Sequence, residues 1–175
     1  RWFALEWVAF VPWLLALDRA ASARASLVSG WLMSVAFVVA VFSWFAPAIA
    51  GYAGISTAVA FIVTLVFAPF LQPQFLVFAV VRYVVRGAHG AVLGAVAAAS
   101  AHVGAEWACP KLFADTLGHG FYASMLMRQA ADLAGAHGLT FAILLANECF
   151  AATWRRGRSG ARSAHVLAPI VAAVA

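Results

Sequence analysis

Residues 25–46 read ASLVSGWLMSVAFVVAVFSWFA and contain no charged side chain. An α-helix of about this length crosses the hydrocarbon layer of a bilayer, which is roughly 30 Å thick. Hydrophobic residues make up 66% of the 175-residue chain and charged residues only 10%. A soluble domain has about 25% charged residues. The composition therefore excludes a water-soluble globule and predicts an integral membrane protein.

Further apolar runs flank this stretch on both sides. We expect membrane spans at 2–17, 25–46, 57–81, 91–109, 130–154 and 163–175, with the last one cut at Ala175. Pro69 and Pro73 predict one kinked helix in the third run. Residues 47–56 are expected to form a loop, and 110–129 a longer irregular stretch. The prediction is a single all-α domain, 1–175, built as a polytopic transmembrane helix bundle of about six spans.

The positive charge is concentrated between these runs. Of the eleven Lys and Arg residues, eight lie within 18–24, 82–90 and 155–162. Loops rich in Lys and Arg stay on the cytoplasmic side of a membrane. We therefore expect these three loops inside and the segments 47–56 and 110–129 outside. Because the arginines are juxtamembrane, the net charge of +5 does not predict binding to nucleic acid.

One face of the fourth run carries small residues and then two polar ones. Gly90, Gly94, Ala98, His102 and Glu106 recur every four residues, which places them on one side of a helix. Small residues let helices pack closely in lipid, so this face is expected to pack against a neighbour. The fifth run has a similar stripe that includes Ala134 and Gly138.

Polar side chains gather near the outer ends of the fourth and fifth runs. They are either a structured loop whose charges pair with one another, or a surface that docks something at the outer leaflet. His102 and Glu106 lie one turn apart and could hold zinc, but no ligand spacing is diagnostic, so no metal site is predicted. Glu106, Cys109 and Lys111 repeat the residue types of a nitrilase catalytic trio. All three fall within six residues at a helix end, whereas that fold brings them from separate elements, so they are not expected to be catalytic.

Several segments together resemble the N-terminal membrane domain of the apolipoprotein N-acyltransferase family. WFALEWVAFVPWLL (2–15) looks like the family's second span, and residues 30–32 with 42–44 look like its third. Glu106-Trp107 followed by Pro110 and Leu117-Gly118 is similar to the family's outer-face stretch. The most specific likeness is QAADLAGAHGLTF (129–141) followed by Asn147.

The resemblance implies an acyltransferase that moves a fatty acyl chain from phospholipid to the N-terminal diacylglyceryl-cysteine of lipoproteins. The present segment would anchor a nitrilase-like domain, expected beyond Ala175, and would form a lipid-access cleft in the bacterial inner membrane. No catalytic residue and no cofactor is expected in this chain. The implied partners are a membrane phospholipid as donor and a lipoprotein N-terminus as acceptor.

The resemblance also assigns residues. Those expected at the cleft or outer face are Glu106, Trp107, Phe113, Gly118, His119, Gln129 and Asp132. Those expected to serve packing are Gly90, Gly94, Gly135, Gly138 and Asn147.

Other functions remain open at the level of sequence. A transporter or channel subunit would need broken helices with polar groups near mid-bilayer, which only the region of Pro69 and Pro73 offers. A metal-dependent intramembrane hydrolase would use His102 and Glu106. A non-catalytic membrane scaffold is the third alternative.

Overall fold

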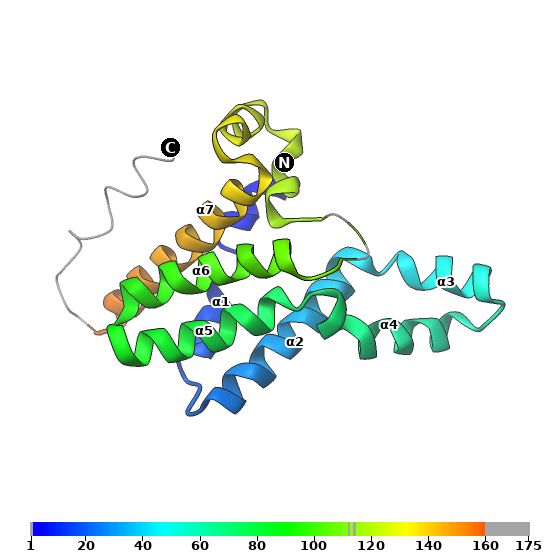
Figure 1. The fold of residues 1–175 in the computed structure, drawn as a ribbon, viewed down its shortest axis with the longest axis horizontal. Coiled ribbons are helices and arrows are strands. Elements are labelled where there is room, and N and C mark those ends of the chain that lie inside the picture. Colours follow the sequence, from blue (N-terminus) through cyan, green and yellow to red (C-terminus); the bar gives the residue numbers. More distant parts are fainter. Residues whose placement is uncertain (1, 112, 114, 160–175) are drawn as a thin grey trace. The chain divides into compact units, whose positions relative to one another are not determined.

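The computed structural model of the protein describes residues 2–111, 113 and 115–159 (Figure 1). It is 85% helical and has no strand in the described residues, which confirms the all-α fold class. The chain forms two compact units. The terminal unit comprises residues 1–19 and 114–175, and the central unit comprises residues 20–113.

In the terminal unit, helices near the start of the sequence pack on helices from its second half. It contains the 3₁₀ helix η1 (Trp2–Trp7), α1 (Val11–Leu17), the 3₁₀ helix η2 (Leu117–Ala123) and the long helix α7 (Met125–Ser159). The helices η1, α1 and η2 all contact α7. The helix α7 is kinked at Ala134 and Gly135, where Gly135 has φ +67°, a conformation that favours glycine.

The central unit is a bundle of five α-helices. They are α2 (Ala23–Phe42), α3 (Phe45–Ala53), α4 (Thr57–Leu71), α5 (Gln74–His89) and α6 (Ala91–Ala108). Local chemistry sets their ends. Ser22 and Ser56 cap the starts of α2 and α4 through their hydroxyl groups, and Gly54 ends α3 in the left-handed conformation.

Close helix packing in the central unit depends on small residues. A Cβ on Gly30 of α2 would lie 2.8 Å from the carbonyl oxygen of Phe75 on α5, and a Cβ on Gly94 of α6 would lie 2.7 Å from the Cβ of Arg86. These approaches leave no room for a side chain, as expected for helices that pack in lipid. The packing of α6 on α5 fixes the direction in which the polar end of α6 points.

The helices agree only in part with the expected spans. By length and composition, Ala23–Phe42, Ala91–Ala108 and Met125–Gly157 could each cross a membrane, and Thr57–Leu71 with Gln74–His89 adds a fourth candidate if this pair, bent by 46°, is one span. Ala4–Leu17 is a shorter apolar helix. The sixth expected span, 163–175, lies outside the described residues.

Two segments that we expected to be loops are helical. Most of 47–56 belongs to α3, because the apolar residues Ala46 and Ala50 pack on Ala60 of α4 and hold the helix in place. The basic segment 82–90 is the last part of α5 up to His89, with a turn at Gly90, whose φ is +88°. The arginines in this segment are thus carried on a helix end, where positive charge also complements the helix dipole.

Candidate functional site

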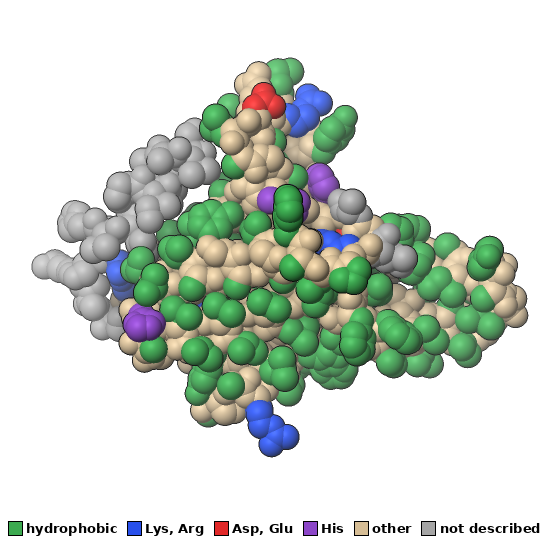
Figure 2. Space-filling view, viewed as in Figure 1, with side chains coloured by type: hydrophobic (Ala, Val, Ile, Leu, Met, Phe, Trp, Pro, Cys, Tyr) green, Lys and Arg blue, Asp and Glu red, His purple; other side chains and the backbone are tan. Residues whose placement is uncertain are grey.

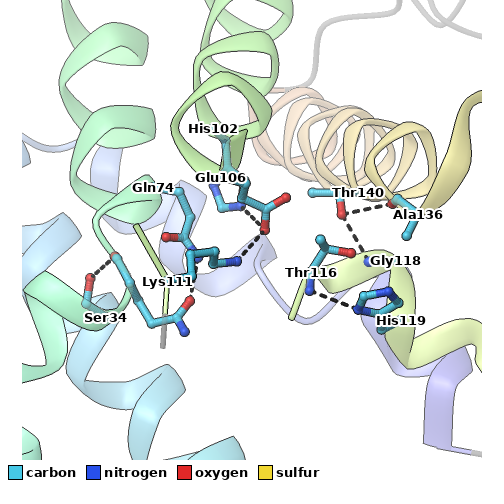
Figure 3. A network of polar contacts seen from close by, with 11 residues as sticks. Ser34, Gln74, His102, Glu106, Lys111, Thr116, Gly118, His119, Ala136 and Thr140 are labelled. Atoms are coloured by element: carbon cyan, nitrogen blue, oxygen red, sulfur yellow. Dashed lines mark hydrogen bonds and ion pairs between the residues drawn. The ribbon is translucent and has the colours of Figure 1, made fainter. Parts of the chain in front are cut away.

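At the C-terminal end of α6, the central unit holds a buried carboxylate and a buried imidazole beside a partly buried ammonium group. His102 is fully buried and Glu106 is 6% exposed, one turn apart on the packed face of the helix. The Oε1 atom of Glu106 lies 3.6 Å from Nε2 of His102 and 3.7 Å from Nζ of Lys111 (Figure 3). A buried carboxylate is costly without compensation, and the lysine just beyond the helix supplies the opposite charge.

Apolar rings and a helix break enclose this group. The ring of His102 packs edge-on against Phe75 and Phe78 of α5, with centroid distances of 5.2 and 6.1 Å. Gln74, the first residue of α5, is also buried, and Figure 3 shows its side chain close to those of His102 and Lys111. The amide of Gln74 donates a hydrogen bond to the side chain of Gln72.

The break between α4 and α5 is itself held by a hydrogen bond from α2. Pro73 has no N–H to donate, and the carbonyl oxygen of Gln72 accepts a hydrogen bond from the hydroxyl of Ser34 at 2.8 Å. The same hydroxyl is 3.1 Å from the carbonyl of Gly30. The bend is therefore held in place, because the carbonyl oxygen of Gln72 at the bend has a hydrogen-bond partner.

The segment after α6 is anchored by aromatic packing. Phe113 stacks on Phe42 with 5.4 Å between ring centroids and also contacts Trp44 and Phe45 at 5.8 and 5.3 Å. Trp107, in contrast, is 80% exposed. An exposed tryptophan at a helix end is typical of the membrane interface.

In the terminal unit, η2 is pressed against α7 at a glycine. The N–H of Gly118 donates to the hydroxyl of Thr140 at 3.0 Å, and that hydroxyl donates to the carbonyl of Ala136 at 3.2 Å (Figure 3). A Cβ on Gly118 would lie 2.1 Å from the same carbonyl oxygen. His119 is exposed, and its Nδ1 accepts a hydrogen bond from the N–H of Thr116, which caps η2.

Hydrogen bonds of Asn147 connect α7 to η1 and to the residue before α1 in the same unit. Asn147 is fully buried in α7, and its Oδ1 accepts from the N–H of Phe10 at 2.8 Å. Its Nδ2 donates to the carbonyl oxygens of Glu6 and Ile143 at 2.8 and 2.9 Å. The carboxylate of Glu6 lies directly over Gly120 of η2, in the space that a Cβ would fill. Trp7 also contacts Phe121, with 5.0 Å between ring centroids.

The expected cleft residues divide between the two units. Glu106, Trp107 and Phe113 belong to the central unit, whereas Gly118, His119, Gln129 and Asp132 belong to the terminal unit. Gln129 and Asp132 are exposed on the part of α7 that precedes the kink. That all seven residues share one cleft stays a prediction.

The expected packing residues have different surroundings. A Cβ on Gly94 would lie against Arg86, and a Cβ on Gly138 would lie against the Cβ of Ala134. Asn147 is buried. Gly90 and Gly135 face open space, and each has a positive φ instead. Glycine at these two positions therefore serves the backbone conformation rather than close packing.

Sequence reasoning overlooked several polar contacts. Gln72, Gln74 and Thr140 were not singled out, although uncharged polar residues inside long apolar runs are a signal for an internal hydrogen bond. No group of three His, Cys, Asp or Glu side chains in the described part of the chain is arranged to hold a metal ion.

The comparisons with known proteins point to one family. No curated protein and no solved structure matches the chain. The model of the family described as apolipoprotein N-acyltransferase N-terminal domain matches residues 1–149, which is most of the 175 residues. The chain therefore belongs to the apolipoprotein N-acyltransferase N-terminal domain family.

Proposed function

We propose that this chain is the membrane domain of an enzyme that transfers a fatty acyl chain from phospholipid to the N-terminal diacylglyceryl-cysteine of lipoproteins. The observation that carries the proposal is the family match over residues 1–149. In this role the chain anchors a catalytic nitrilase-like domain and gives the two lipid substrates access from the bilayer. The catalytic Glu, Lys and Cys belong to that domain and not to this chain.

The surfaces of the helices suit a domain that handles lipids. Large apolar side chains are exposed on α2, α4 and α6, among them Leu32, Ile62 and Leu93. Exposed apolar side chains are stable where the surroundings are acyl chains. A lipid substrate reaches such a domain by lateral diffusion, and only its polar headgroup then needs polar partners.

Polar groups in both units are candidates for contact with lipid headgroups. Glu106 and Lys111 are at the end of α6, and the exposed Trp107 is next to them. On the terminal unit, His119, Gln129 and Asp132 are exposed and available to a substrate. We propose that these residues position headgroups, without taking part in the covalent chemistry.

We further propose the bacterial inner membrane as the location, with the three basic segments in the cytoplasm. Two contacts, one in each unit, support placing the basic segments on a common side. Arg155 of the third basic segment donates a hydrogen bond to Asp18 of the first. In the central unit, the hydroxyl of Tyr83 in the second basic segment lies 3.4 Å from the carbonyl oxygen of Ala21 in the first. Each contact requires its two segments to be on one side of the membrane.

The proposal is tested in cells depleted of their own apolipoprotein N-acyltransferase and supplied with the full-length protein that contains this chain. We expect growth to recover and mass spectrometry to find a third acyl chain on lipoprotein N-termini. Lipoproteins that stay diacylated, although the protein is inserted in the membrane, would refute the proposal.

One observation favours a second candidate, a transporter or channel subunit. The bend between α4 and α5 carries the buried amides of Gln72 and Gln74. Broken helices with buried polar groups are common at transporter substrate sites. The same cell experiment separates the two, since a transporter leaves lipoproteins diacylated.

A further inference from the structure

The hairpin formed by α3 and α4, residues 45–71, is apolar on nearly all of its surface. No charged residue occurs between Arg24 and Arg82. Ala60, Thr64 and Ala68 form the buried stripe of α4. Ile62, Val66 and Phe70 lie on the side opposite this stripe and are 61, 60 and 74% exposed. Val59, Val63 and Phe67 are exposed on a neighbouring face of the same helix.

Such a surface is not stable in water. Exposed apolar patches on soluble proteins are limited to a few hundred Å² and are usually interrupted by polar groups. On the face of the molecule shown in Figure 2, apolar side chains cover the α3–α4 region, and no charged side chain is seen there. The hairpin therefore requires hydrocarbon around it.

The helix α2 does not need the hairpin to span the bilayer. With twenty residues, α2 rises roughly 30 Å and reaches across the hydrocarbon layer by itself. The helix α3 begins at Phe45, only three residues after α2 ends. The next helices of the bundle, α5 and α6, pack along each other and α5 packs along α2, whereas the hairpin extends past their ends (Figure 1).

Contacts at the two helix breaks that flank the hairpin hold it in its bent position. At the α4–α5 break, which is bent by 46°, Ser34 binds the carbonyl oxygen of Gln72. At the α2–α3 break, the ring of Phe113 contacts Trp44 and Phe45. Both breaks therefore have partners from other parts of the unit.

We infer that the α3–α4 hairpin is a re-entrant arm that lies among the acyl chains of the leaflet reached by the C-terminal end of α2, and that it does not cross the bilayer. Its tip fits an interfacial position. Tyr52, near the tip, is 97% exposed, and Trp44 at the base is 57% exposed. Tyrosine and tryptophan favour the level of the headgroups, so they fix the depth of the arm at both ends.

The depth of the arm in the bilayer tests this inference. Cys109 and Cys149 of this chain, and every cysteine in the rest of the full-length protein, are replaced by serine. Single cysteines are then introduced as Ile62→Cys and Phe67→Cys on the arm, and as Leu32→Cys at the middle of α2 as a matched control. Each site is exposed, so a fluorescent label is tolerated. The labelled proteins are placed in vesicles whose lipids carry a nitroxide quencher either near the headgroup or near the chain end.

We expect labels at positions 62 and 67 to be quenched more strongly by the nitroxide near the headgroup, and the label at position 32 by the one near the chain end. Equal depth for arm and control would overturn the inference, because α4 would then be part of a straight span. Loss of quenching by both lipids at positions 62 and 67 would overturn it as well, because the arm would then face water or another protein.

Discussion

The Oδ1 atom of Asn147 accepts a hydrogen bond from the backbone N–H of Phe10 at 2.8 Å, although the two residues are 137 positions apart in the sequence. The same amide group donates to the carbonyl of Glu6. One buried side chain therefore satisfies two backbone groups at the junction of η1 and α1, where the helical hydrogen-bond pattern is interrupted. This contact joins the start of the chain to α7 and closes the terminal unit.

Replacing this residue, as Asn147→Leu, is expected to destabilise the protein. The buried N–H of Phe10 and the partly buried C=O of Glu6 would lose their partner, and an unsatisfied buried group costs about 1–3 kcal/mol. The midpoint of thermal unfolding in detergent should fall clearly. Thr153→Ala is the matched control, because Thr153 is exposed on α7 and bonds only to its own helix. Equal midpoints for the two variants would contradict the role of Asn147.

A methyl group at position 118 is expected to separate η2 from α7. In Gly118→Ala, the new Cβ would fall 2.1 Å from the carbonyl oxygen of Ala136, so the backbone must shift and lose the bond to Thr140. We expect a loss of about 1–3 kcal/mol in the free energy of unfolding, measured by denaturant titration.

Gly104→Ala provides the control for that substitution. Nothing lies within 4 Å of a Cβ at position 104, and the residue is inside α6. Alanine favours a helix over glycine by about 1 kcal/mol, so this variant should be as stable as the parent or more stable. A Gly118→Ala protein that matched Gly104→Ala in stability would show that the close approach is relieved at no cost.

The α-helical class and the small-residue faces could be predicted from sequence, because charge content and four-residue spacing report directly on lipid and on helix packing. Gly94 and His102 do lie on the packed face of α6. The helix α3 could not be predicted, because Pro47 and Gly51 within it and Gly54 after it are residue types that are common in loops. What makes it helical is its contact with Ala60 of α4, a tertiary effect.

The candidate site, too, could be predicted only in part from the sequence. The spacing of His102 and Glu106 predicts a shared helix face, and the structure places their side chains together. Gln74 lies close to His102 and Lys111 because α5 packs against α6 (Figure 3). No local sequence pattern encodes this packing. The hydrogen bond from Ser34 to the α4–α5 break likewise joins residues 38 positions apart.

Glu106→Ala in the full-length protein is expected to lower acyl transfer while the protein remains inserted in the membrane. Misplacing a bound substrate by about 1 Å can cost roughly a hundredfold in rate, so we expect a loss of this order for a headgroup-positioning residue. Acyl transfer per molecule of inserted protein is the quantity to measure. Unchanged activity would return Glu106 to a purely structural role.

The double variant Glu106→Ala with Lys111→Met separates positioning from charge balance. If Glu106 serves only to neutralise Lys111, which lies 3.7 Å away, removing both charges should restore activity. If Glu106 positions a substrate, activity should stay low in the double variant. Restored activity would therefore contradict the proposed role at the cleft.

The orientation proposed for the membrane is tested by fusions to alkaline phosphatase, which is active only outside the cytoplasm. Fusions after Ala53 and after Lys111 are expected to be active, and fusions after Arg86 and after Arg158 inactive, because Lys- and Arg-rich segments stay in the cytoplasm. The opposite pattern would reverse the proposed orientation.

The most direct test of the central claim is an acyl-transfer assay with the purified full-length protein in phospholipid vesicles. The donor is a phospholipid with a labelled acyl chain, and the acceptor is a peptide with an N-terminal diacylglyceryl-cysteine. We predict that the label appears on the α-amino group of the peptide and that a lysophospholipid is formed in equal amount. A correctly inserted protein that transfers no label to this acceptor would contradict the account.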